Sequence, residues 1–180
     1  ICVSRPRRFG KSMAANMLAA YYKRDEDTRA LFDKLMISQA QSYKEHLNQY
    51  DVIRINMQQF LSETHSMEEM LSKICNYLIQ DLQEAYEQIR FREKTSLVQT
   101  MKDVFANTGH PFVILIDEWD CLFREYQQDK DAQKKYLDFL RVWLKDQDYV
   151  GLAYMTGILP IKKYGSHSAL NMFIEYSMTD

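Results

Sequence analysis

Residues near the start of the chain, RPRRFGKS from Arg5 to Ser12, are of the types that bind phosphate groups. The last three, Gly10, Lys11 and Ser12, match the end of the P-loop (Walker A) pattern G-x-x-x-x-G-K-[ST]. In such a loop the lysine reaches the β- and γ-phosphates of a nucleoside triphosphate, and the hydroxyl can ligate Mg²⁺. Arg5, however, stands where the pattern has its first glycine. The segment is therefore either a phosphate loop with one substitution or a basic turn that contains Gly-Lys-Ser.

Two carboxylates follow the most apolar segment of the chain. FVILI, residues 112–116, is apolar throughout and shows no alternation, which is typical of a strand buried on both faces of a parallel sheet. Asp117 and Glu118 come directly after it, at the end of the strand where ligands bind in open α/β sheets. Asp117 suits a contact to the metal, direct or through water. Glu118 suits a general base that polarises an attacking water.

A later segment, VGLAYMTGI (150–158), predicts another strand that ends at Thr156. The short polar side chain of Thr156 is of a type that can read a γ-phosphate or hold the attacking water.

Each of these segments also has a purely structural interpretation. Gly-Lys-Ser can be a plain turn before a helix, Asp117-Glu118 a solvated strand end, and Thr156-Gly157 the close of a strand. Taken singly, each structural interpretation is at least as good as the functional one. It is their order along the chain that favours a nucleotide site.

The elements around these residues predict an α/β fold. Residues 1–3 predict the tail of a strand, and residues 11–23 predict a helix in which Met13, Met17, Ala20 and Tyr21 share one face. Residues 27–49 predict short helices, and residues 51–57 a second strand.

Three further helices have clear sequence signals. Ser66 and Glu69 form a capping box before a helix that runs to about residue 90. A second helix begins at Ser96 and stops at Gly109, and a third covers 131–145. Strands that alternate with helices predict a P-loop NTPase-like parallel sheet flanked by helices. We expect residues 1–180 to form one such domain, helix-rich and truncated at both ends.

The composition excludes several classes of protein. Lys plus Arg number 23 and Asp plus Glu 25, so no global basic field favours nucleic acid. The three cysteines show no C-x-x-C spacing, which favours reduced thiols in a cytoplasmic protein. No apolar run approaches the roughly 20 residues of a membrane span. The chain starts at Ile1 without an initiator Met, so we interpret it as an excerpt.

The segments RPRRFGKS, LIDEWD (115–120) and TGILPIKKYGSHSALNMF (156–173) resemble the AAA-ATPase-like domain of bacterial P-loop proteins. That family is often described together with a C-terminal nuclease-like domain of the PD-(D/E)XK type. The resemblance covers nearly the whole chain. In the family an arginine followed by Pro-Arg-Arg-Phe is the usual form of the loop, so Arg5 looks like a family variant. Trp119 stands where tyrosine is more usual, and Cys121-Leu122 replaces a stretch that often contains proline.

The resemblance implies a site made of two motifs. Gly10, Lys11 and Ser12 bind phosphate and Mg²⁺, Asp117 and Glu118 form the acidic (Walker B) motif, and Asp120 matches the aspartate that follows it. A nuclease-like domain, or a partner protein, would lie outside the chain. From residues and resemblance together, the expected catalytic residues are Lys11, Glu118 and Thr156; the nucleotide-binding residues are Arg8, Phe9, Gly10, Lys11 and Ser12; and the metal ligands are Ser12 and Asp117.

The basic residues of the loop allow several interpretations. Arg5, Arg7 and Arg8 can neutralise triphosphate charge, contact a nucleic-acid backbone, or form a solvated turn, and we favour the first for at least one of them. Residues 162–164 (Lys-Lys-Tyr) could also contact nucleic acid. The guanine-reading pattern N-K-x-D does not occur, so the expected ligand is ATP by default and by resemblance.

Two functions remain open at this stage. The first is an ATPase that binds ATP with Mg²⁺ and hydrolyses it slowly as a conformational switch. The second is a nucleotide-binding regulatory or scaffolding module with negligible turnover, which is favoured because the sequence identifies no trans-acting arginine finger. A third hypothesis, a nucleic-acid-binding domain, lacks the basic composition that it would need.

Overall fold

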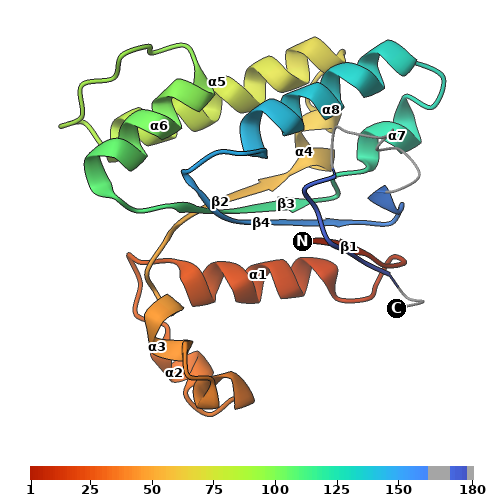
Figure 1. Ribbon diagram of the computed structural model, residues 1–180. Helices are drawn as coiled ribbons and strands as arrows, with labels where there is room; N and C mark the ends of the chain where they lie inside the picture. Colours follow the sequence, from red (N-terminus) through yellow and green to blue (C-terminus); the bar gives the residue numbers. More distant parts are fainter. Residues whose placement is uncertain (162–170, 178–180) are drawn as a thin grey trace.

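A parallel β-sheet forms the centre of the molecule. The computed structural model describes residues 1–161 and 171–177. Within them, five strands pair in parallel in the order β2-β3-β4-β1-β5 (Figure 1). The strands are β1 (Cys2–Ser4), β2 (Asp51–Asn56), β3 (Phe112–Asp117), β4 (Val150–Gly157) and β5 (Glu175–Tyr176). The predicted α/β fold with a parallel sheet flanked by helices is thus confirmed.

Strand β3 is the most deeply buried element of the sheet. It lies between β2 and β4, and each of its residues is buried, as the unbroken apolar run predicts. Its register with β2 pairs Asn56 with Asp117, so these two strands end at the same level. Because all strands are parallel, the polar residues at their carboxyl ends lie along one edge of the sheet.

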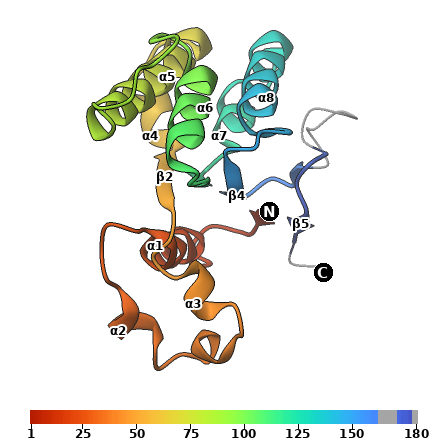
Figure 2. The same cartoon turned by 60° about the vertical axis from the view of Figure 1, so that its left-hand side comes forward.

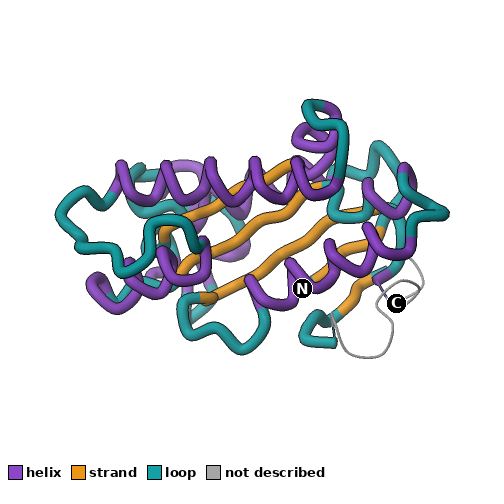
Figure 3. Tube along the Cα trace, turned by 90° about the horizontal axis from the view of Figure 1, so that it is seen from above, coloured by secondary structure: helices purple, strands orange, loops and turns teal. Residues whose placement is uncertain are grey.

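Helices cover both faces of the sheet. Helix α1 (Lys11–Tyr22) packs on one face, against β2, β3 and β4. The opposite face is covered by α5 (Met67–Ala85), α6 (Leu97–Thr108) and α8 (Lys130–Leu144), with the short helices α4 (Met57–Ser62) and α7 (Cys121–Glu125) nearby (Figures 1 and 2). Seen from above, the strands lie side by side between these layers (Figure 3). The main hydrophobic core fills the space between the sheet and α5, α6 and α8, and includes Ile74, Met101 and Trp143.

The helix caps and the helix stop predicted from the sequence are present in the structure. The Ser66 side chain accepts a hydrogen bond from Glu69 N, and the Ser96 side chain does the same for Gln99 N. Gly109 ends α6 in the left-handed conformation, with φ of 69°. Helix α5 ends at Ala85 rather than near residue 90, because the chain turns there and the Tyr86 hydroxyl donates to Asp51 at the start of β2.

The predicted apolar face of α1 is wrong for its two methionines and right for Tyr21. Met13 and Met17 are 68% and 49% exposed, whereas Ala15 and Tyr21 are buried. Apolar residues occur on every side of this helix, so its sequence does not determine which side meets the sheet. The small side chain of Ala15 is 2% exposed, so it lies on the covered side of the helix while the two methionines do not.

Residues between α1 and β2 form a helical excursion, as predicted. It contains α2 (Arg29–Phe32), the 3₁₀ helix η1 (Met36–Gln39) and α3 (Tyr43–His46). Tyr21, Phe32, Tyr43 and Leu47 form a small second core that attaches the excursion to the end of α1. In Figure 2 the excursion lies beyond α1, away from the sheet. Residues 162–164, considered above for nucleic-acid contact, lie outside the described residues.

A buried carboxylate on α6 holds the segment around Arg92, which precedes this helix, by hydrogen bonds. Asp103 is 2% exposed and accepts hydrogen bonds from the backbone N and the Nε of Arg92 and from Gln99 Nε2. Burial alone raises the pKa of Asp103, but the donors from Arg92 and Gln99 together outweigh burial and hold the pKa below its ordinary value of 3.8. Because the folded-state pKa is depressed, the stabilisation is complete above the unfolded-state pKa and is lost as the pH falls through the folded-state pKa.

We therefore expect Asp103→Asn to lower the free energy of unfolding by about 1–2 kcal/mol at neutral pH. Urea unfolding of both proteins from about pH 7 to about pH 3 measures this difference, which should narrow below roughly pH 4. A difference that stays constant over the whole range would show that the charge of Asp103 contributes nothing.

Candidate functional site

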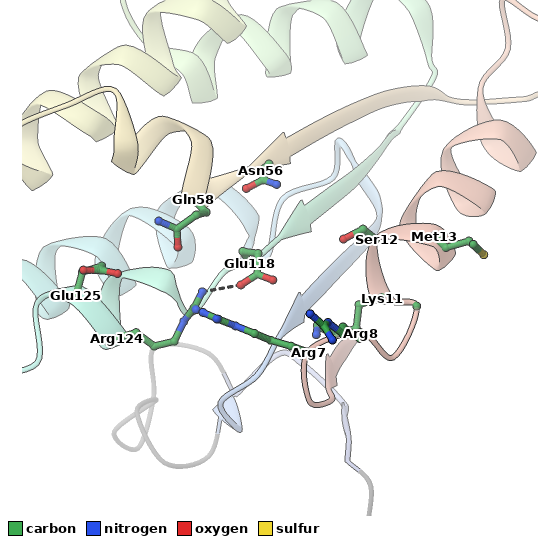
Figure 4. Close-up of a pocket in the computed structure, with 11 residues that line it drawn as sticks. Arg7, Arg8, Lys11, Ser12, Met13, Asn56, Gln58, Glu118, Arg124 and Glu125 are labelled. Carbon is green, nitrogen blue, oxygen red and sulfur yellow. Dashed lines mark hydrogen bonds and ion pairs between the residues drawn. The ribbon is translucent and has the colours of Figure 1, made fainter.

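A cavity of about 520 Å³ lies at the carboxyl edge of the sheet. Its walls come from the loop after β1, the start of α1, the end of β2, the turn after β3, and the helices α4 and α7. Figure 4 shows how these side chains surround it. The lining residues are Arg7, Arg8, Gly10, Lys11, Ser12, Met13, Asn56, Gln58, Glu118, Arg124 and Glu125.

The basic loop bends tightly between β1 and α1. Arg8 and Gly10 both adopt left-handed backbone conformations, with φ of 66° and 72°. Gly10, the N-cap residue of α1, adopts this conformation without steric strain because it has no Cβ atom. The Lys11 side chain is folded back into the loop, where its Nζ donates to the carbonyl oxygens of Arg5 and Pro6, both at 3.0 Å. The ammonium group and the amino end of α1 thus face the same concave loop.

Direct contact joins the loop to the acidic strand end. Ser12 Oγ donates to Asp117 Oδ2 at 2.5 Å, although the two residues lie 105 positions apart in the sequence. Asp117 is 2% exposed, and its other oxygen accepts from Glu118 N at 3.0 Å and from the Thr156 hydroxyl. The predicted convergence of Gly-Lys-Ser with the carboxylates at one edge of a parallel sheet is confirmed as geometry.

Glu118 projects into the cavity from a strained turn. Its φ of 54° is left-handed, which is rare for a residue with a side chain. The Glu118 carboxylate accepts a hydrogen bond from Arg124 Nη2 at 2.5 Å, and both side chains are largely buried (Figure 4). An arginine on α7 therefore neutralises one of the two carboxylates that line the cavity.

Asp120 ties this turn to the end of β4. Its side chain is fully buried, and Oδ2 accepts from the backbone N–H groups of Ile158 and Leu159 at 3.0 and 2.8 Å. Arg124 Nε lies 3.7 Å from the same oxygen. The chain is packed closely here, since a Cβ atom added to Gly157 would lie 2.6 Å from the indole nitrogen of Trp119.

The predicted site residues do not all reach the cavity. Arg8, Gly10, Lys11, Ser12 and Glu118 line it, and Asp117 lies directly behind Ser12. The remaining two differ from expectation. Phe9 is 59% exposed and is not among the lining residues, and Thr156 is fully buried with its hydroxyl on Asp117.

The sequence analysis missed four polar residues of the cavity. These are Asn56, Gln58, Arg124 and Glu125. Asn56 had a signal, because it is a polar residue at the end of a predicted strand. Arg124 had only a weak one, its i,i+4 spacing from Asp120 on the chain that leaves β3.

The cysteines near the site are not reactive nucleophiles. Burial raises the pKa of the Cys2 and Cys121 thiols to about 12, so both stay protonated near neutral pH. No disulfide joins the cysteines. Burial also raises the pKa of Tyr154 on β4, and the charge of Asp117 adds to the shift.

The donor set at Ser12 and Asp117 fits a hard divalent cation. Asp117 is a buried carboxylate, and in the described part of the chain it forms no ion pair with Lys or Arg. A buried carboxylate without a cationic partner is costly. Mg²⁺ is commonly held by one or two protein oxygens, with phosphate and water as its other ligands. Among the described residues, no cluster of three or more His, Cys, Asp or Glu side chains that could hold a metal occurs.

Fold and site together define a class of protein. A parallel sheet flanked by helices, with a Gly-Lys-Ser loop between its first strand and first helix, is consistent with a P-loop NTPase. A family model described as Predicted AAA-ATPase matches residues 1–166, and the chain belongs to this family. No curated protein matches the chain. Among the described residues, no helix is both long enough and apolar enough to cross a membrane.

Proposed function

We propose that this protein binds ATP with Mg²⁺ and hydrolyses it slowly, as a conformational switch for a fused or partner effector. The contact between Ser12 and Asp117 is the observation that carries the proposal, because it places a loop hydroxyl and a buried carboxylate beside one cavity. Family membership supports a nucleotide as the ligand.

The charges of the cavity favour a polyanion. Four of the lining side chains are cationic, those of Arg7, Arg8, Lys11 and Arg124, while Glu118 and Glu125 are the anionic ones. The amino end of α1 adds partial positive charge at the loop. When a triphosphate binds, Lys11 exchanges its two carbonyl partners in the loop for phosphate oxygens, a charge-assisted contact that is stronger than the ones it loses.

Ser12 and Asp117 are the residues that would hold the metal. Bound Mg²⁺ neutralises phosphate charge and acts as a Lewis acid on the phosphate oxygens. We propose that Thr156 supports this pair from behind by orienting the Asp117 carboxylate, since its buried hydroxyl bonds that group and does not face the cavity.

Glu118 is the proposed general base. Its carboxylate accepts a proton from water as the water oxygen bonds to the γ-phosphorus. The bond between the γ-phosphorus and the bridging oxygen breaks, and the electron pair stays with ADP. The proton on Glu118 then passes to the released phosphate, which restores the carboxylate.

We expect Lys11→Ala to abolish tight binding of Mg–ATP. Isothermal titration calorimetry should give a dissociation constant raised by at least about tenfold, because a charge-assisted contact to phosphate is lost. In the wild-type protein, ATP at about 100 times its dissociation constant should raise Tm by roughly 5–10 °C. The variant should lose most of this shift. Lys102→Ala, at an exposed position of α6, is the matched control and should bind like wild type.

Two results would contradict the proposal. One is a wild-type protein whose Tm does not respond to Mg–ATP. The other is a Lys11→Ala variant that binds ATP as tightly as Lys102→Ala does.

One observation favours the alternative of a nucleotide-binding regulatory or scaffolding module with negligible turnover. The proposed base, Glu118, forms an ion pair with Arg124 through Oε2, so one of its two carboxylate oxygens is already occupied by a cation. Single-turnover hydrolysis separates the two functions, as argued in the Discussion.

A further inference from the structure

Arg124 is a cationic cavity residue to which the proposed function gives no individual role. It comes from α7, on the side of the cavity opposite the phosphate loop (Figure 4). Its side chain is 19% exposed, which is low for an arginine, and it lies among carboxylates.

Its two contacts differ in kind. Asp120, on one side, is fully buried and is itself held by two backbone N–H groups, so this partner is fixed. Glu118, on the other side, is 24% exposed and faces the cavity, so this partner can be replaced. Arg124 Nε is buried and forms no hydrogen bond in the described part of the chain, since Asp120 Oδ2 lies 3.7 Å away.

A guanidinium group in this position can bind a phosphate without a large movement. It carries five N–H donors in a rigid fork, and its hydrogen bond to Glu118 uses only one nitrogen. A terminal phosphate in the space beside Glu118 would carry close to two negative charges. It would therefore compete strongly with a single carboxylate for the same cation.

We propose that Arg124 is an arginine, supplied by the same chain, that binds the terminal phosphate of the bound triphosphate. At rest it neutralises Glu118. When a triphosphate is present, the guanidinium group stays on Asp120 and donates to the phosphate, and Glu118 is released to accept a proton from water. A diphosphate does not reach Arg124 and leaves the ion pair intact. This inference rests on the proposed function, since it assumes that phosphates bind at the loop.

The test measures binding preference in a protein that does not turn over. Glu118→Gln is the parent, and its dissociation constants for Mg–ATP and Mg–ADP are measured by calorimetry. Adding Arg124→Gln should weaken ATP binding by about 10-fold or more and ADP binding by less than about twofold, because one charge-assisted hydrogen bond to the terminal phosphate is lost. Arg124→Lys should recover part of the preference. Arg141→Gln, which removes an exposed arginine on α8 paired with Asp138, is the control and should change neither affinity.

A second variant guards against misfolding, because Arg124→Gln leaves buried Asp120 without its cation. Asp120→Asn combined with Arg124→Gln removes both charges and keeps an acceptor for the backbone N–H groups of Ile158 and Leu159. The same loss of ATP preference in this combination supports the inference. An unchanged preference in every variant that folds overturns it and leaves the proposed function standing. A parent protein that binds neither nucleotide overturns both.

Discussion

Glu118→Gln is expected to lower the rate of ATP hydrolysis by about 10²–10³-fold while Mg–ATP binding stays within about threefold of wild type. Glutamine keeps the size of the side chain, and its amide NH₂ group cannot accept the proton of the attacking water. The change does not touch the Gly-Lys-Ser loop or the pair Ser12 and Asp117, which are the residues proposed to bind phosphate and metal. The expected variant therefore retains ATP without consuming it.

Single-turnover hydrolysis, with the protein in excess over radiolabelled ATP, measures this effect without interference from product release. Glu87→Gln, at an exposed position beyond the end of α5, removes the same charge far from the cavity and serves as the control. If wild type and Glu118→Gln both hold ATP with equal, negligible turnover, the protein is a binding module. If both hydrolyse ATP at the same appreciable rate, Glu118 is not the base.

Local sequence signals predicted the fold well because they act over short distances. The Ser66 and Ser96 caps, the Gly109 stop and the unbroken apolar run of β3 each specify their element from neighbouring residues alone. The alternation of these elements then leaves few arrangements other than a parallel sheet with helices on both faces. The contact between Ser12 and Asp117 follows from that arrangement. Asp117 is the last residue of β3, and Ser12 lies in the first turn of α1, after the loop that leaves the parallel strand β1.

Features that depend on packing between distant segments were not predictable in this way. Ala15 lies on the buried side of α1 while Met13 and Met17 are exposed, and the sequence, with apolar residues all around the helix, does not predict this. Strand β4 continues one residue past Thr156, to Gly157, and the Thr156 hydroxyl donates to Asp117 rather than facing the cavity. The ion pair between Arg124 and Glu118 depends on the turn at Glu118, and no local sequence pattern predicts the left-handed conformation of that residue.

Asp120 joins the turn after β3 to the exit of β4, and no other described carboxylate of this region is as deeply buried. It accepts from Ile158 N and Leu159 N and lies beside Arg124. Its second oxygen, Oδ1, is buried without a hydrogen-bond partner in the described part of the chain, so the carboxylate already carries a desolvation cost that its other contacts must offset.

We expect Asp120→Ala to lower the free energy of unfolding by about 3–5 kcal/mol. The change leaves two buried backbone N–H groups without an acceptor and Arg124 next to a void. Such a loss is a large part of the total stability of roughly 5–15 kcal/mol that is usual for a domain.

Urea denaturation measures the loss caused by Asp120→Ala, with Asp138→Ala as the control. That residue forms an exposed ion pair with Arg141, which should contribute less than about 1 kcal/mol. Asp120→Asn, which keeps an acceptor for Ile158 and Leu159, should fall between the two. If Asp120→Ala proves no more costly than Asp138→Ala, then Asp120 does not hold the end of β4, and Arg124 has no fixed partner from which to reach a phosphate.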